Sequence, residues 1–192
     1  MENTGMIEIT NACIAVENLT TPELREFFSY WENLRGAKFA PSWTDVELID
    51  MPAKLLPYLA VVEVRPAPLD FVYAFYGTGY MALKARDLTG RSIMETRPNE
   101  NAQVIFEQYR RTLEARKPLA FRRTVAGAIA GKNGNPTQTT LRLPLSADGE
   151  GVQRIMSLSD LRDNPAMRDF YETYGRDRPH RPAAMISGAH AG

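Results

Sequence analysis

The chain has almost none of the residues that usually bind metals or act as nucleophiles. Cys13 is the only cysteine among 192 residues, which excludes an internal disulfide and a metal site built from several cysteines. The two histidines, His180 and His190, both lie near the carboxyl terminus. The rest of the chain therefore offers no histidine as a haem ligand, a metal ligand or a general base. The scarcity of cysteine and histidine predicts a protein without a metal site and disfavours an enzyme.

The sequence also lacks a charge imbalance and a long apolar segment. Lys and Arg together number 23, and so do Asp and Glu. A neutral chain has no overall field that would attract nucleic acid or an anionic membrane. The first residues show no basic region followed by an apolar core, and no stretch reaches the roughly 18 apolar residues of a membrane span. The sequence therefore predicts a cytoplasmic protein that binds neither nucleic acid nor membrane.

An amphipathic helix is predicted close to the amino terminus. Residues 1–19 show no hydrophobic period and are expected to form a flexible lead. Residues 20–36 then repeat apolar side chains at intervals of three and four, the spacing of one helix face. This face is wide enough to cover a sheet and still contact a second subunit, so we expect it to form a dimer interface. Its residues are Leu24, Phe27, Phe28 and Trp31.

The most informative stretch is FVYAFYGTGYMALKARDLTGRSI, from Phe71 to Ile93. Phe71 to Tyr76 is apolar at every position, which indicates a strand covered on both faces. Gly77 and Gly79 follow, and glycine allows both a positive φ and a close backbone approach. A phosphate-binding loop is disfavoured, because the third glycine and the Lys-Ser/Thr pair of such loops are missing.

The order of the predicted elements carries a resemblance. The predicted order is a helix, two strands, short helices, a long helix at 99–116, and three strands at 119–128, 137–146 and 152–161. Together with the YGTGY and RDLTGRSI segments, this order resembles the stand-alone PAS domain family common in alphaproteobacteria. The resemblance covers about residues 25–162.

The resemblance implies an α+β protein with a PAS fold, in which a five-stranded antiparallel sheet carries helices on one face. It places the PAS domain at 37–162, after the amino-terminal helix. Residues 163–192 would form a carboxyl-terminal extension. This extension is expected to be disordered from about residue 175, where Pro, Gly and Ala are frequent.

A cavity is implied between the curved sheet and the short helices. Strand alternation places Arg123 on the same face as Phe121 and Val125, so it is one charged candidate for the cavity. Arg91 is another, which either pairs with a surface acid or points inward. The remaining expected lining consists of aromatic rings and thioethers, which either surround a ligand or fill a dry core: Tyr73, Phe75, Tyr80, Met94, Phe106 and Met156.

The function that the resemblance implies is signalling. We expect a module, active as a homodimer, that mediates regulated contacts with an unidentified signalling protein. The alternative is a small-molecule sensor whose cavity binds an apolar organic anion, because a buried arginine keeps its proton and needs an anionic partner. Catalysis is the least favoured of the three candidate functions. We expect no cofactor: haem would lack a histidine ligand, and a covalently bound flavin would lack its cysteine, since Cys13 lies outside the domain.

Overall fold

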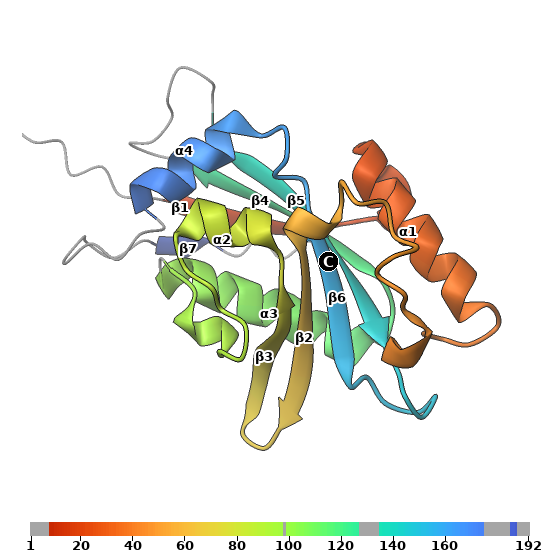
Figure 1. Cartoon of the computed structure of the whole chain (residues 1–192). Coiled ribbons are helices and arrows are strands. Elements are labelled where there is room, and N and C mark those ends of the chain that lie inside the picture. The colour runs from red at the N-terminus through yellow and green to blue at the C-terminus, as the bar shows by residue number, and fades with distance from the viewer. Residues whose placement is uncertain (1–7, 98, 127–134, 175–184, 188–192) are drawn as a thin grey trace, which may run out of the picture.

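The computed structural model describes residues 8–97, 99–126, 135–174 and 185–187 (Figure 1). Within these ranges, no helix has both the length and the apolar character needed to cross a membrane. The elements in chain order are β1 (Glu8–Ile14), η1 (Val16–Asn18), α1 (Pro22–Arg35), η2 (Trp43–Asp45), η3 (Leu56–Tyr58), β2 (Leu59–Pro66), β3 (Leu69–Tyr76), α2 (Thr78–Lys84), η4 (Ile93–Glu95), α3 (Asn99–Ala115), β4 (Leu119–Ala126), β5 (Thr137–Leu145), β6 (Arg154–Ser159), α4 (Pro165–Tyr174) and β7 (Met185–Ser187), where η marks a 3-10 helix.

The strands form one sheet in the order β3-β2-β6-β5-β4-β1-β7. Strands β2 to β6 pair antiparallel with their neighbours. The predicted α+β class, with the five-stranded antiparallel sheet of the PAS fold, is therefore confirmed. Two strands extend this sheet beyond β4, because β1 pairs antiparallel with β4 and β7 pairs parallel with β1.

Both added strands lie where the sequence predicted no structure. The expected flexible lead contains β1, whose register pairs Asn11 with Arg123 of β4. Ile9 is the one fully buried side chain of β1, so backbone pairing holds the strand without producing a hydrophobic period. In the expected disordered tail, Met185–Ser187 form β7. Residues 175–184 and 188–192 lie outside the described part of the chain.

Three helices lie on one face of the sheet, as predicted for the PAS fold, and the amino-terminal helix covers the other face. Helices α2, α3 and α4 pack against the inner face, and α1 packs against the opposite, outer face (Figure 1). Successive strand residues point to opposite faces. On β5, Leu141 and Leu143 therefore belong to the outer core with α1. Arg142, between them, points to the inner face and contacts Ser157 of β6.

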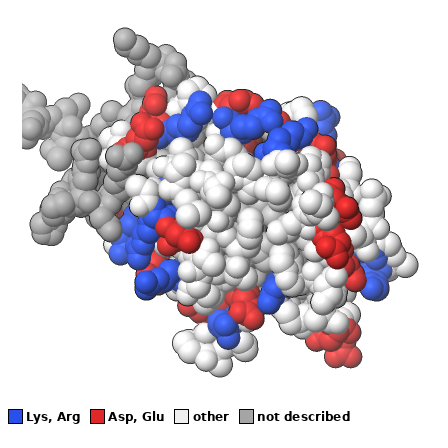
Figure 2. Space-filling model, in the orientation of Figure 1, with Lys and Arg blue, Asp and Glu red and all other residues white. Residues whose placement is uncertain are grey.

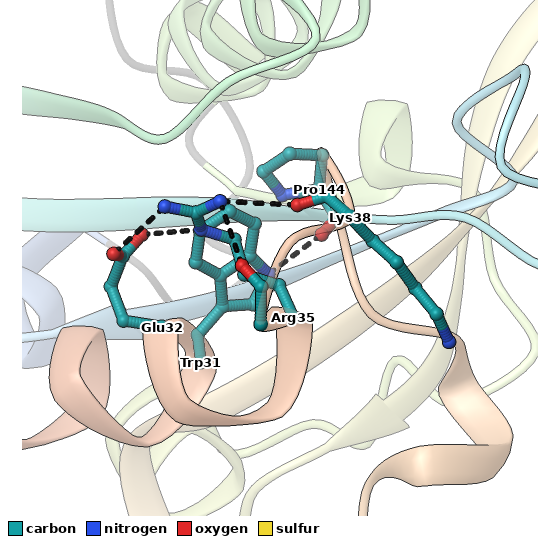
Figure 3. A network of polar contacts seen from close by, with 6 residues as sticks. Trp31, Glu32, Arg35, Lys38 and Pro144 are labelled. Atoms are coloured by element: carbon teal, nitrogen blue, oxygen red, sulfur yellow. Dashed lines mark hydrogen bonds and ion pairs between the residues drawn. The ribbon is translucent and has the colours of Figure 1, made fainter.

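Helix α1 is fixed to the outer face by one buried tryptophan. The indole N–H of Trp31 donates to the carbonyl of Pro144 at 2.8 Å (Figure 3). Arg35 lies beside the indole, 5.5 Å from the ring centre, and forms a paired hydrogen bond with Glu32 at 2.7 and 3.0 Å. This ion pair is partly exposed and contributes little on its own. The hydrophobic contact and the buried hydrogen bond therefore hold the helix.

The residues proposed for a dimer interface are largely unavailable to a partner. Leu24, Phe27 and Trp31 are each at most 1% exposed, because they pack on the chain's own sheet. Phe28 alone is half-buried. The three buried residues are thus wrongly assigned to an interface, while dimerisation itself stays a prediction.

A close backbone approach fixes the turn into α2. A Cβ atom on Gly77 would lie 2.4 Å from the carbonyl oxygen of Pro57, a distance at which the backbone must move. The φ angle of Gly77 is −62°, which any residue can adopt. Glycine is therefore required here for space, as predicted, and not for a positive φ.

We expect Trp31→Phe to lower the free energy of unfolding by about 1–3 kcal/mol, because the buried Pro144 carbonyl would lose its donor. Trp43→Phe is the matched control, since Trp43 is half-buried and its ring contacts Arg154 at 5.4 Å. Urea unfolding of both variants measures the difference. Equal losses in the two variants would contradict the role given to the Trp31 hydrogen bond.

Candidate functional site

A cavity lies between the inner face of the sheet and helices α2, α3 and α4. The space open to the centres of water-sized spheres is about 40 Å³, which at roughly 10–15 Å³ per water holds about three water molecules. Its lining comes from eight elements: Ala60 (β2), Tyr73 and Tyr76 (β3), Tyr80 and Lys84 (α2), Ile105, Gln108 and Tyr109 (α3), Arg123 (β4), Gln138, Thr140 and Arg142 (β5), Ser157 and Ser159 (β6), and Tyr171 (α4).

A β-bulge brings the tyrosines of β3 to this cavity. Two consecutive residues of β2 pair with Tyr73 and Phe75, which leaves Ala74 as an extra residue on β3. The bulge reverses the alternation, so that Tyr76 points inward and Phe75 outward. Ring centres lie 4.8 Å apart for Tyr73 and Tyr76, and 5.2 Å apart for Tyr76 and Tyr80. Burial raises the pKa of all three phenols, so they remain neutral.

Arg142 is held in the cavity wall by neutral groups. Its Nε and Nη2 donate to Oε1 of Gln108 at 3.1 and 2.6 Å, and its Nη1 donates to Ser157 at 2.9 Å. The guanidinium carbon lies 3.7 Å from the centre of the Tyr109 ring. The amide of Gln108 in turn donates to Asn11 of β1 at 2.7 Å. These contacts fix the position of Arg142 but leave its charge without a counter-ion.

Arg123 has a donor that nothing in the described chain satisfies. Its Nη2 donates to Oε1 of Gln138 at 2.6 Å and to the hydroxyl of Tyr171 at 2.5 Å. Its Nε is buried and has no hydrogen-bond partner. A buried donor without a partner costs about 1–3 kcal/mol, and more when it is charged. An acceptor bound next to Arg123 would remove this cost.

Lys84 adds a third positive group to the cavity. It is the last residue of α2 and only 7% exposed, and its Nζ lies 4.9 Å from the centre of the Tyr171 ring. Burial lowers the pKa of Lys84, and the charge of Arg123 lowers it further, against an opposing effect of Tyr171. The lysine can therefore lose its proton, an option that arginine does not have.

The cavity is positively charged and has no acid to balance it. No Asp or Glu lines it, and Lys84, Arg123 and Arg142 form no ion pair with any described residue. Burying an ion without a partner costs several kcal/mol. Tyr171 responds to this field: burial would raise its pKa, but Arg123 and Lys84 outweigh burial and lower it. The arrangement therefore favours an anion.

The structure places three of the predicted ligand residues at the cavity, namely Tyr73, Tyr80 and Arg123. Phe106 does not line the cavity, and its ring centre lies 5.4 Å from that of Phe71. Arg91 takes the surface alternative, with its side chain 60% exposed and 3.7 Å from Glu95. Of the two arginines predicted for the cavity, Arg123 therefore lies at it and Arg91 does not.

Three further predicted residues lie away from the cavity. Phe75 and Met156 belong to the outer core with α1, and Met94 is 37% exposed. Met156 was placed on the wrong face because β6 is buried on both faces, so its hydrophobic pattern does not show which side points inward.

Lys84, Arg142 and Tyr171 were not predicted. Arg142 could have been found, since it alternates with Leu141 and Leu143 as Arg123 alternates with its neighbours. The sequence does not show that Lys84 points inward, because Lys84 is the last residue of a short helix. Tyr171 lies beyond the expected domain boundary at residue 162.

The strand that leads into α4 ends at a buried carboxyl group. Oδ1 of Asp160 accepts the backbone N–H of Thr139 at 2.7 Å. The carbonyl of Asp160 accepts from the Asn164 amide at 3.3 Å, and Oδ1 of Asn164 accepts the N–H of Met167 at 3.2 Å in the first turn of α4. Burial raises the pKa of Asp160 to about 6, although the Thr139 N–H opposes the shift.

A family model described as a PAS domain matches residues 19–159. No curated protein matches the chain. In the part of the chain that the structure describes, no group of three or more His, Cys, Asp or Glu residues could hold a metal ion.

We expect Asp160 to make the protein less stable as the pH rises from about 4 to 6. The carboxyl group of Asp160 binds its proton more tightly in the folded state than in the unfolded state, where its pKa is 3.8. Protonation of Asp160 therefore stabilises the fold fully below pH 3.8, and this contribution is lost as the pH rises through the folded pKa. The change is on the order of 2 kcal/mol.

Asp160→Asn keeps the acceptor for the Thr139 N–H and should remove this part of the dependence of stability on pH. Denaturant unfolding against pH measures it, with exposed Asp163→Asn as control; an unchanged slope in Asp160→Asn would refute the assignment.

Proposed function

Because the chain belongs to the PAS domain family, we propose that it is a sensory module whose inner cavity binds a small organic anion. The observation that carries this proposal is the buried, unpartnered Nε of Arg123, which faces a cavity with two more cationic side chains and no acid. A carboxylate or phosphate oxygen supplies both the missing acceptor and the missing negative charge.

The rest of the cavity supports the class of ligand. The tyrosine rings of β3 and α2 offer an apolar surface, while Thr140, Ser157 and Ser159 offer hydroxyl groups. A volume of about 40 Å³ suits a compact molecule with one charged end. Haem and a covalently bound flavin are not part of the proposal, since Cys13 lies exposed on β1 and both histidines lie beyond the domain.

We propose regulated protein contact as the output of this sensor, in the cytoplasm and without catalysis by the chain itself. Figure 2 shows a face whose centre, over α2, β2 and β3, is almost free of charged side chains, while charges gather at its rim. Tyr58, Phe75 and Met81 are half-buried side chains on or beside these elements. This uncharged centre supports contact with a signalling protein or a second copy of the chain.

Thermal unfolding in the presence of small carboxylates and phosphate tests the ligand proposal. An anion that binds only the folded state raises the midpoint, and at a hundred times its Kd it adds about 2.7 kcal/mol. We expect a shift for the wild type and none, or a much smaller one, for Arg123→Met. Arg122→Met is the matched control, because Arg122 is the exposed neighbour on the same strand and its loss removes the same charge.

Two results would contradict the proposal. Either no member of the anion panel shifts the wild-type midpoint, or the shift persists in Arg123→Met at the size seen in Arg122→Met. Light scattering of the intact chain at tens of micromolar tests the predicted homodimer separately, and a monomer at that concentration would exclude it.

A further inference from the structure

We propose that Lys84 binds the ligand covalently: its side-chain amine forms a reversible imine with the carbonyl carbon of a small oxo acid, whose carboxylate pairs with Arg123. The inference rests on the proposed function, because both use the same cavity. It adds the chemical class of the ligand, a carboxylate with an adjacent aldehyde or ketone.

Lys84 differs from two lysines at the surface, because its Nζ lies against the ring of Tyr171 instead of an acid. Lys54 is exposed and lies 2.7 Å from Glu26, and Lys38 is exposed and lies 3.8 Å from Asp45. Lys84 is buried at the cavity and makes no ion pair or hydrogen bond within the described chain. Desolvating an ammonium group without a counter-ion costs several kcal/mol, and the contact with the Tyr171 ring offsets only part of this cost.

The surroundings of Lys84 favour the neutral amine, which is the form that attacks a carbonyl. Burial lowers its pKa, and the nearby charge of Arg123 acts in the same direction. Desolvation and a neighbouring cation are the two devices that generally activate a lysine for imine formation.

Arg123 and Lys84 are placed to hold the two ends of an oxo acid. Both approach the same ring, since the guanidinium carbon of Arg123 lies 5.6 Å and Nζ of Lys84 lies 4.9 Å from the centre of Tyr171. In a 2-oxo acid the carboxylate and the carbonyl carbon are adjacent. The charge of Arg123 also acts on the pKa of Lys84, and we infer that an acid paired with Arg123 extends its carbonyl group toward the lysine.

Tyr76 supplies a second unsatisfied group for this ligand. Its hydroxyl lines the cavity, is buried and has no hydrogen-bond partner. Burial raises its pKa well above the ordinary value, so it stays protonated and can donate to the carbonyl oxygen. In the non-covalent complex that precedes the imine, the carboxylate and the ketone oxygen would thus satisfy the two unpartnered polar atoms of the cavity lining.

The reaction is a condensation without oxidation or reduction. The lone pair of Nζ forms a bond to the carbonyl carbon, and the π electrons of the carbonyl move to its oxygen. Two protons pass from the nitrogen to that oxygen, the carbon–oxygen bond breaks, and water leaves as the C=N bond forms. With room for about three waters in the cavity, acids as small as glyoxylate and pyruvate suit the site.

Borohydride trapping with pyruvate tests the inference, since hydride reduces the imine to a stable secondary amine. Mass spectrometry of tryptic peptides then locates the adduct. We expect Lys84 of the wild type to be labelled at least about tenfold more than Lys54, because burial favours the neutral amine of Lys84 and Arg123 would hold the acid beside it. The comparison is made within one folded protein, so it does not depend on the stability of a variant.

Two variants sharpen this result. Lys84→Met should abolish the adduct, and Arg123→Met should reduce it to the level of Lys54. Equal labelling of Lys84 and Lys54 in the wild type would overturn the imine, and full labelling in Arg123→Met would overturn the anchor.

Thermal unfolding with pyruvate and with lactate separates this inference from the function on which it rests. Lactate has the carboxylate but no carbonyl group. If both acids raise the midpoint and Lys84 is not trapped, the imine is wrong and anion sensing stands. If neither raises the midpoint and no adduct forms, both are wrong.

Discussion

The structure depends on polar side chains that are buried on the inner face of the sheet. On β5, strand alternation sends three leucines toward α1 and Gln138, Thr140 and Arg142 toward the other helices. An interior with Arg123 and Arg142 is stable only if amides, hydroxyls and aromatic rings surround the two guanidinium groups. Gln108 of α3 and Tyr171 of α4 provide these groups. The outer core, closed by Trp31, and the apolar residues around the cavity supply the burial that offsets the cost of these polar groups.

Much of the fold could be predicted because the order of the elements and the doubly apolar strand β3 are local features of the sequence. Arg123 could be predicted for the same reason, since its apolar neighbours on alternate positions show its face. The same argument failed for Phe75, because one extra residue in a strand reverses every later side chain. A bulge of this kind depends on pairing with β2, so the hydrophobic pattern of β3 alone does not show it.

The rest of the site could not be predicted because distant segments complete it. Tyr171 reaches Arg123 from α4, past the predicted end of the domain. Asn11 reaches Gln108 from β1, within the predicted lead. Asn11 belongs to a segment without a hydrophobic period. The helical period of α4 shows that Tyr171 faces the core but not that it reaches Arg123, so tertiary packing decides both contacts. Lys84 is similar, since the end of a seven-residue helix looks the same whether its last side chain points to solvent or inward.

The hydrogen bonds from the cavity lead to β1, the first described strand, and to α4, the last helix of the described chain. Arg142 connects through Gln108 to β1, and Arg123 connects directly to α4. Binding equilibria that share such groups are coupled, and coupling is reciprocal by thermodynamic necessity. A protein that recognised β1 or α4 in only one arrangement would therefore change the affinity of the cavity for its ligand by the same factor by which the ligand changed affinity for that protein. An isolated chain and a chain in its signalling complex would then differ in ligand threshold, with the same residues in the cavity.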